Sequence, residues 1–403
     1  MKLIENNSET LIAFETIQLW LGGLYIVFSR ALEPIGWISS NLVWMIVGLL
    51  FIFTLICDNF RFNVNGVIIL EGLLVVASAV TGIIVADNKE FFFDALKTLS
   101  LSLIVGYSML NITINQKNVN WFVYSWVLSG VILCLYIIKS GGYTFGKIVR
   151  ISLNEATNAN TLAVFLMFCV WGLIFLLTTK KVKPLMIVIY VILFALFVYV
   201  ILNTASRKAF IGVLIIVSMW AIFGLIPFLR KMNFIYRSLV IALLFFVPIF
   251  VVNRFGDAFL SAFELMNARM EMLSSNTERS DLIKDAFLVF ENHPLFGVGL
   301  NNYKIFSFNG KYSHNTYVEI LACTGIIGAF WAYCIWGLQI WKIIKMFKNR
   351  ANKLLLVNVL SLFIVLAFIC VGQILYYNIG LLMIMHLLYI LSHNYSMFEV
   401  AKE

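Results

Sequence analysis

Long stretches without a single charged side chain dominate this sequence. Residues 35–57 and residues 185–202, for example, contain no Asp, Glu, Lys or Arg. About 20 apolar residues in a helix cross the hydrocarbon core of a bilayer. The chain is 62% hydrophobic and only 12% charged, whereas about a quarter of the residues in a soluble domain are charged. The single hydrophobic core of a soluble domain cannot bury so many apolar segments, so the sequence predicts a polytopic membrane protein.

The spanning segments are expected to be helices, because lipid offers no partner for an unpaired backbone N–H or C=O group. The expected fold class is therefore all-α, a transmembrane helical bundle with about twelve spans by hydropathy. The candidate spans lie near residues 11–29, 35–57, 62–85, 91–114, 120–138, 157–178, 185–202, 208–227, 237–252, 316–341, 354–373 and 378–392. No repeat or linker divides the chain, so we expect one transmembrane domain over residues 1–403.

Lys and Arg in the short loops set the expected orientation. They cluster in residues 180–183, 230–237 and 342–353, and with twelve spans all three loops face the cytoplasm. Both termini are then cytoplasmic, in a multi-pass protein of the cytoplasmic membrane. The net charge of +9 is explained by this topology, so we expect membrane lipid and no nucleic acid as a partner. The opposite, external face receives one large loop, residues 253–315.

The sequence gives no sign of a metal site or a cofactor. Its six cysteines all lie in apolar runs, where cysteine is an ordinary small buried side chain. No CxxC or Cys/His spacing typical of zinc occurs. We therefore expect neither a metal nor a cofactor.

Two amphipathic helices are expected in the large external loop. Apolar residues recur at helical spacing over residues 257–275, which fits a helix lying on the membrane surface. A second helix is expected to begin at Ser275, where Ser275 and Glu278 match a capping box. It is expected to end at His293, because Pro294 disfavours helical backbone in the residue before it.

Arg279 lies in the first turn of this second helix, where a cation opposes the helix dipole. An anion docked at the helix N-terminus would explain its position, because the free N–H groups there already favour phosphate. The alternative is an arginine paired with Glu278 or Asp281 on a solvated face. The sequence alone leaves both interpretations open.

Three further cations lie in external segments. Arg207 and Lys208 sit between two apolar helices with almost no loop, either snorkelling to lipid headgroups or directing a guanidinium at a phosphate. Arg150 lies in the preceding external loop, where a plain surface arginine is the simpler interpretation.

Two titratable residues mark possible functional sites inside or beside the membrane. Glu71 lies near the middle of the third span, where a carboxylate either serves function, with a partner such as Lys97 or an Arg, or packs as a neutral hydrogen-bonded group. His314 precedes an apolar run on the same face as the arginines and could act as a general base, although a lone interfacial histidine is more often structural. His293, His386 and His393 are assigned to structure.

Three segments in this order, TASRKAF, ERSDLIKDAFLVFENHPLFGVGLNNY and SHNTYVEILACTGIIG, resemble the O-antigen ligase and polymerase superfamily. The shared features are an external Arg after a small residue, a second Arg before P-x-x-G-x-G, and His-Asn opening a span with G-x-x-G. The matching positions here are Arg207, Arg279, Pro294, Gly297, Gly299, His314, Asn315, Gly325 and Gly328. Asn158 and Asn160 match an upstream N-P-N element, although Ala159 replaces its proline.

The resemblance implies a GT-C-like bacterial glycosyltransferase that moves a glycan from undecaprenyl diphosphate onto a hydroxyl, outside the cytoplasmic membrane and without a metal. Arg207 and Arg279 would neutralise the diphosphate leaving group, and His314 would accept the hydroxyl proton in an inverting reaction. Arg150, Asn160, Asn315 and Lys208 are the expected substrate-binding residues. Expected partners are the lipid-linked glycan donor and acceptor, together with a chain-length regulator and a flippase.

Three functions stay open at this point. A polymerase joins repeat units of capsular polysaccharide, exopolysaccharide or O-antigen, whereas a ligase passes finished glycan to lipid A-core or another acceptor. The excess of Lys over Arg favours an AT-rich, Gram-positive source and hence the polymerase. A polysaccharide transporter or flippase is the alternative of another class, typified by paired charges near the midplane and broken helices, whereas here only Glu71 lies deep.

Overall fold

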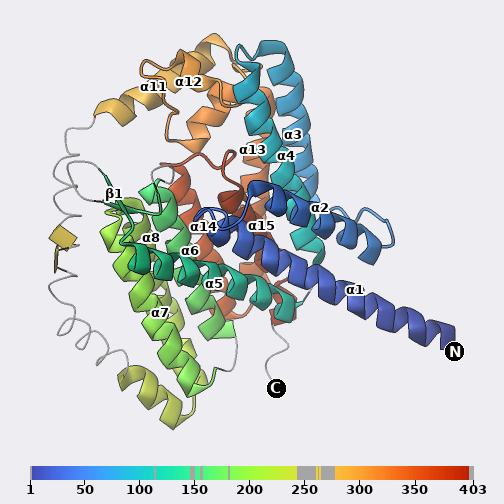
Figure 1. Ribbon diagram of the computed structural model, residues 1–403, viewed down its shortest axis with the longest axis vertical. Coiled ribbons are helices and arrows are strands. Elements are labelled where there is room, and N and C mark those ends of the chain that lie inside the picture. Colours follow the sequence, from blue (N-terminus) through green and yellow to red (C-terminus); the bar gives the residue numbers. More distant parts are fainter. Residues whose placement is uncertain are drawn as a thin grey trace.

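The computed structural model describes residues 2–112, 115–145, 150–154, 158–179, 182–242, 260–261, 263–264 and 277–398. This part of the chain is almost entirely helical, with one short antiparallel pair of strands, β1 (Tyr143–Phe145) and β2 (Arg150–Ser152) (Figure 1). The all-α membrane bundle predicted from the sequence is therefore confirmed.

Within the described residues, nine helices are long and apolar enough to cross a membrane. They are α2 (Ser40–Cys57), α3 (Gly66–Val85), α4 (Lys89–Ile112), α5 (Gln116–Ser140), α6 (Ala159–Thr179), α7 (Pro184–Asn203), α8 (Arg207–Met219) with its continuation Trp220–Gly224, α13 (Thr316–Lys348) and α14 (Lys353–Cys370). The other helices include α1 (Lys2–Val27), α9 (Leu225–Lys231), α11 (Thr277–Asn292), α12 (Tyr303–Phe306) and α15 (Ile379–His393).

The predicted count of about twelve spans stays a prediction. The expected span 237–252 lies largely outside the described residues. Helix α15, expected as a full span over 378–392, has only 15 residues. At 1.5 Å per residue it is shorter than the hydrocarbon core of about 30 Å. Its N-terminus therefore begins below one membrane surface if its C-terminus reaches the other.

The core of the bundle lies around α6, which packs against α5, α7, α8 and α14 and runs through the middle of the molecule (Figure 1). Its sequence is apolar on every side, and a helix of this kind is stable only when other helices surround it. Most of its residues are buried. The Trp171 indole N–H donates to the Asn358 carbonyl on α14 at 2.9 Å, which ties the two helices together.

Helix α13 is not the single straight span expected at residues 316–341. Gly325 has φ 58° and ψ −166°, a conformation open to glycine and strained for other residues. The Tyr333 hydroxyl donates to the Tyr317 carbonyl at 2.9 Å, although sixteen residues of straight helix would separate them by about 24 Å. The helix therefore folds back at Gly325, and its short arm (residues 316–324) packs against its long arm (residues 326–348).

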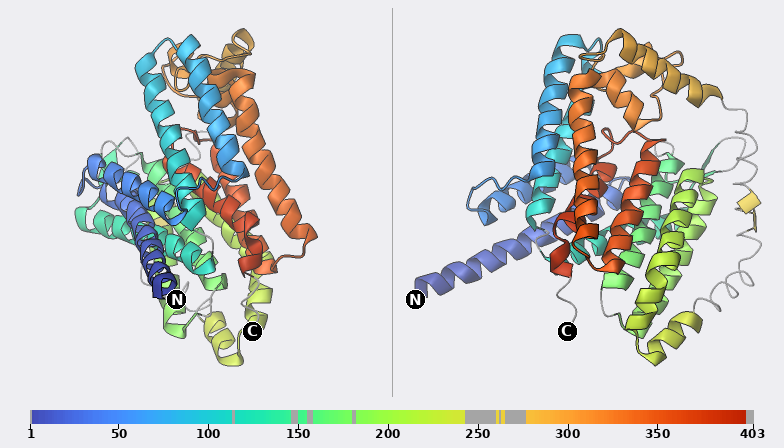
Figure 2. Two further views of the ribbon diagram at one scale, coloured as in Figure 1. Left: turned by 90° about the vertical axis from the view of Figure 1, so that its right-hand side faces the viewer. Right: turned by 180° about the vertical axis from the view of Figure 1, so that it is seen from behind.

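A cap stands over one end of the bundle, formed by α11, α12 and the segment between them (residues 277–306). It rests on α13, beside the tall pair α3 and α4 (Figure 2). Helix α11 ends at Asn292, as Pro294 predicts. Its predicted start at Ser275 and the predicted surface helix over 257–275 fall outside or almost wholly outside the described residues.

Candidate active site

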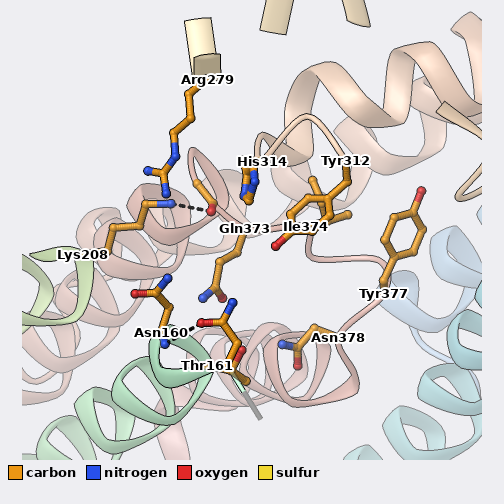
Figure 3. A pocket seen from close by; sticks show the side chains of 12 residues that line it. Asn160, Thr161, Lys208, Arg279, Tyr312, His314, Gln373, Ile374, Tyr377 and Asn378 are labelled. Atoms are coloured by element: carbon orange, nitrogen blue, oxygen red, sulfur yellow. Dashed lines mark hydrogen bonds between the residues drawn. The ribbon is translucent and has the colours of Figure 1, made fainter. Parts of the chain in front are cut away.

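A cavity of ≈ 190 Å³ lies between the end of the bundle and the cap. Cationic and aromatic side chains line one side of it, and amide and hydroxyl side chains line the other (Figure 3). The first group consists of Lys208, Arg279, Tyr312 and His314. The second group includes Asn158, Asn160, Thr161, Gln373 and Asn378, and the wall is completed by Gly372, Ile374 and Tyr377.

Five helices begin at this cavity. Asn158 precedes α6, Lys208 is the second residue of α8, Arg279 lies in the first turn of α11, His314 precedes α13, and Asn378 is the N-cap of α15. Each helix N-terminus carries about half a positive charge, from N–H groups with no intrahelical acceptor. The fold therefore directs five partial charges, two cationic side chains and a histidine at one space, which suits an anion.

His314 is held uncharged at this site. Burial lowers its pKa from 6.5 to about 4, and the positive charges of Arg279, Lys208 and Lys311 lower the pKa in the same direction. Its ring lies against Tyr312, with centroids 4.1 Å apart. At this pKa the ring is a weaker base than a free imidazole, but it is neutral at pH 7 and can accept a proton, as the general-base role expected from the sequence requires.

Glu319, a residue that sequence reasoning missed, organises the segment that carries His314. The Ser313 N–H donates to Glu319 Oε2 at 2.6 Å, and Glu319 is buried. The Ser313 hydroxyl also contacts the backbone of Asn315. These bonds hold His314 at φ 60°, in the left-handed region. A carboxylate one turn inside an apolar run was the available sequence signal.

Asn315 and Thr316 fix the next part of the wall. Asn315 Oδ1 accepts hydrogen bonds from the N–H groups of Tyr317 and Val318, at 2.9 and 3.3 Å, so this side chain caps α13. It does not contact the His314 ring through any hydrogen bond among the described residues. The Thr316 hydroxyl donates to the Gln373 carbonyl at 2.5 Å and accepts from the Leu375 N–H at 2.8 Å.

The remaining expected binding residues are only partly brought together. Arg207, the first residue of α8, is close enough to Arg279 for their charges to repel, but it is not among the described residues that line the cavity. Lys208 lines it and donates to the Gly372 carbonyl. Asn160 lines it as expected. Arg150 begins β2, and its side chain lies outside the described part.

Arg279 has no carboxylate partner among the described residues. Glu278, one of the two partners considered for it, instead accepts hydrogen bonds from Lys311 and Asn309, both at 2.7 Å. The hydrogen bond and charge of Lys311 lower the Glu278 pKa. Asp281, the other carboxylate considered as a partner for Arg279, has its Oδ1 atom 3.6 Å from Lys284 Nζ. In the part of the chain that the structure describes, Arg279 therefore faces the cavity without a carboxylate partner, which favours the anion-binding interpretation.

The P-x-x-G-x-G motif of the cap and the G-x-x-G motif of α13 pack against each other. The N–H groups of Val298 and Gly299 donate to carbonyls of the short arm of α13, and the Ile326 N–H donates to the Pro294 carbonyl at 2.8 Å. A Cβ on Gly325 would lie 2.3 Å from the Leu295 carbonyl oxygen. Gly325 thus allows α13 and the P-x-x-G-x-G segment of the cap to approach each other closely.

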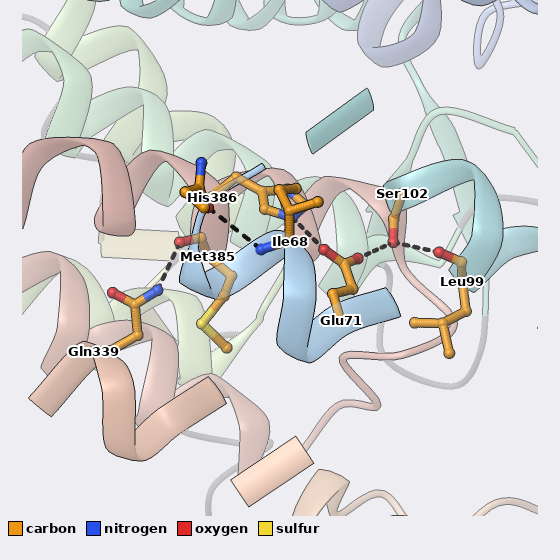
Figure 4. Close-up of polar contacts among 8 residues, drawn as sticks. Ile68, Glu71, Leu99, Ser102, Gln339, Met385 and His386 are labelled. Carbon is orange, nitrogen blue, oxygen red and sulfur yellow. Dashed lines mark hydrogen bonds and ion pairs between the residues drawn. The ribbon is translucent and has the colours of Figure 1, made fainter. Parts of the chain in front are cut away.

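A second polar cluster lies deep in the bundle, away from the cavity (Figure 4). Glu71 Oε2 lies 2.6 Å from His386 Nε2, and the Ser102 hydroxyl donates to Glu71 Oε1 at 2.6 Å. The partner suggested from sequence, Lys97, instead lies over the Trp44 ring. His386 was assigned to structure without a partner, and the sequence held no signal that would pair residues so far apart.

Comparison with known proteins supports the resemblance drawn from the motifs. Residues 192–333 match a family model described as O-antigen ligase, and this range contains Arg207, Arg279 and His314. Over 163 residues the chain is 27% identical to the teichuronic acid biosynthesis protein TuaE of Bacillus subtilis (strain 168). That match covers 38% of this chain and 33% of TuaE, so the chain spans about a third of the length of this relative.

These similarities confirm the O-antigen ligase and polymerase superfamily as the one that the chain resembles. They support a membrane protein with a polysaccharide polymerase or ligase type of function.

Proposed function

We propose that the protein is a polymerase that joins undecaprenyl-diphosphate-linked repeat units into a surface polysaccharide. One observation carries the proposal: five helix N-termini, Lys208 and Arg279 surround a single cavity beside a neutral His314. A diphosphate is the dianion that such a site would bind and stabilise as a leaving group. The site would lie at the outer face of the cytoplasmic membrane, with both termini in the cytoplasm.

The reaction follows from this arrangement. The acceptor hydroxyl oxygen forms a bond to the anomeric carbon while the bond from that carbon to the diphosphate oxygen breaks. The bonding electrons leave with the diphosphate, whose growing charge Arg279 and Lys208 stabilise. The hydroxyl proton passes to His314. Attack from the side opposite the leaving group inverts the anomeric configuration.

Arg207 contributes to binding through the positive electrostatic potential at the cavity. It is the first residue of α8, next to Lys208 in the sequence, and the repulsion between its charge and that of Arg279 is offset when an anion binds beside Arg279. This is a ground for expecting tighter binding of a dianion than of a neutral glycan. A flippase that supplies donor and a regulator of chain length are the expected partners.

Polymerase is preferred over ligase because of the kind of relative that the chain matches. TuaE is named for teichuronic acid biosynthesis in a Gram-positive bacterium, a class of cell without lipid A-core. The match favours a polysaccharide product, although the cavity could serve either reaction.

Transport of a lipid-linked glycan is the second candidate, and two structural findings favour it. The deep Glu71 is paired with His386, and α13 is broken at Gly325. Paired charges and broken helices are typical of transporters. The cations at the cavity argue for bond formation instead, so the two functions need a direct test.

The test uses the full chain in proteoliposomes with lipid-linked repeat units extracted from a strain that lacks the protein. A ladder of products supports the polymerase, and single transfer to a foreign acceptor supports the ligase. Movement of lipid-linked glycan across the bilayer with no new glycosidic bond supports transport and sinks the proposal. Arg279→Ala should abolish the ladder, whereas Lys284→Gln, on the same helix but in an exposed pair with Asp281, should leave it intact.

A further inference from the structure

The wall of the cavity opposite the cations carries the most specific unexplained feature of the site. It consists of amide and hydroxyl side chains, and no charged side chain lies on it among the described residues (Figure 3). We call Asn158, Thr161, Gln373 and Asn378 the amide wall. The diphosphate chemistry makes no use of these groups, so they call for a different ligand.

Gln373 supplies an acceptor that is not satisfied within the described protein. Its side-chain Oε1 is buried and has no hydrogen-bond partner there, which is costly for a buried polar group unless a ligand completes it. Its backbone is fixed, because its carbonyl accepts from the Thr316 hydroxyl at 2.5 Å. The side chain lines the cavity and extends between Lys208 and Asn378 in Figure 3.

The two asparagines are oriented by the bonds that their carbonyl ends make. Asn158 Oδ1 accepts from the Asn160 N–H at 2.9 Å, and Asn378 Oδ1 accepts from the Leu381 N–H at 3.2 Å. Neither Nδ2 group donates to another described residue. The amide wall therefore offers the N–H donor groups of Asn158, Asn378 and Gln373, the Gln373 acceptor and the Thr161 hydroxyl on a fixed frame.

This pattern fits the hydroxyl groups of a sugar, because each hydroxyl both donates and accepts a hydrogen bond. The size of the cavity limits how much of a glycan its walls can contact. Its ≈ 190 Å³ is below the roughly 300–1,000 Å³ of sites for drug-sized ligands, so the walls suit one ring, and the rest of a repeat unit would extend out of the cavity. The lack of charge on this wall suits a neutral ring and not a uronic acid, whose carboxylate would be left without a cation there.

We propose that the amide wall binds the neutral sugar joined directly to the diphosphate, and that Gln373 and Asn378 determine which sugar is accepted. The inference rests on the proposed function, because the cations opposite the wall must hold the diphosphate. It adds a specificity subsite for a single ring to that site.

Binding of lipid analogues to the purified full chain in nanodiscs tests this subsite without turnover. The probes are geranylgeranyl diphosphate with no sugar and the same diphosphate bearing glucose, galactose, N-acetylglucosamine or glucuronic acid. Wild-type protein should bind at least one neutral form more tightly than the bare diphosphate, and the glucuronic acid form less tightly than that neutral form. If no neutral sugar improves binding, the inference is overturned.

Two variants test whether the amide wall causes the tighter binding of the sugar-bearing diphosphate. Gln373→Met keeps the length of the side chain but removes its amide, and Asn378→Ser keeps a helix cap but removes the Nδ2 donor. Each should weaken binding of the preferred sugar form about tenfold, the worth of one good hydrogen bond, and leave the bare diphosphate unchanged. Equal weakening of both probes, or of neither, overturns the inference.

The matched control is Gln339→Met. Gln339 is also a buried glutamine, and its Oε1 has no hydrogen-bond partner among the described residues. Its Nε2, however, donates to the Met385 carbonyl in the bundle, away from the cavity. It should not change the affinity for either probe. Failure of the wild-type protein to bind even the bare diphosphate would instead overturn the proposed function, and the subsite with it.

Discussion

His314 and His386 lie in two polar regions of the same chain with opposite surroundings. His314 faces a cavity with Arg279 and Lys208, and burial and those charges lower its pKa to about 4. His386 is buried in the bundle, 2.6 Å from the carboxylate of Glu71. A Cβ on Gly106 would lie 2.3 Å from the His386 ring, so the space for that ring comes from a glycine on the facing helix.

The difference teaches how each region contributes. At the cavity, Arg279 has no carboxylate partner among the described residues, an arrangement that favours a bound anion. In the deep cluster Glu71 accepts a hydrogen bond from Ser102 and lies against the His386 ring, which joins α3, α4 and α15. The first arrangement suits chemistry and the second suits a framework. Variants that separate activity from stability therefore test this contrast directly.

The largest effect is expected from His314→Gln. Removing the proton acceptor should lower kcat by about 10²–10⁴-fold, the usual contribution of a general base, with no loss of thermal stability. Rates of ladder formation in proteoliposomes and Tm in detergent measure the two quantities. His293→Gln is the control, because His293 packs against Phe306 in the cap and should keep full activity. A His314→Gln enzyme within tenfold of wild type would refute the assigned role.

Glu71→Leu should show the reverse pattern. Leaving the His386 Nε2 group buried without its hydrogen-bond partner is expected to cost about 1–3 kcal/mol of stability. The double variant Glu71→Leu/His386→Leu should recover most of the lost Tm, because an apolar pair leaves no buried polar group without a partner. If the double variant is as stable as wild type yet inactive, the deep cluster takes part in function and the transport interpretation gains.

A smaller effect is expected at Glu319, which acts on His314 through Ser313. Glu319→Leu leaves the Ser313 N–H without its acceptor, at a cost of about 1–3 kcal/mol, and loosens the segment that holds His314. We expect a drop in kcat with KM unchanged. Glu319→Gln keeps an acceptor oxygen and should restore much of kcat. Equal losses in both variants would show that the carboxylate charge, and not the hydrogen bond, is required.

The sequence predicted these two regions unequally, for physical reasons. Arg279, Lys208 and His314 could be placed on one face because topology and helix starts are local signals. The end of α11 followed from Pro294. The break at Gly325 could not be foreseen, because it depends on the P-x-x-G-x-G segment packing against it, and a straight helix satisfies the same apolar pattern.

Long-range pairing was likewise beyond the sequence. Gln373 lies in a segment read as the end of a span, yet the Thr316 hydroxyl fixes it beside the cavity. Lys97 was one possible partner considered for Glu71, but the helix packing brings His386 to Glu71 instead. Neither contact follows from composition or spacing. Both require knowing which helices are neighbours.

The smallest expected effect concerns the pH dependence that His314 imposes. The acid limb of kcat/KM reports the free enzyme, so it should fall near pH 4 and not near 6.5, because activity is lost only when the imidazole becomes protonated.

Lys311 lies outside the described lining of the cavity, but its charge lowers the His314 pKa and its ion pair holds the carboxylate of Glu278. In Lys311→Gln one positive charge is gone and Glu278 is no longer neutralised, and both changes favour the protonated ring. The acid limb should then move to higher pH by a fraction of a unit, with activity at neutral pH kept. Lys284→Gln, which removes an exposed charge on α11, should leave the limb in place. A limb that moves to lower pH in Lys311→Gln, or stays fixed, would show that another group sets the acid limb.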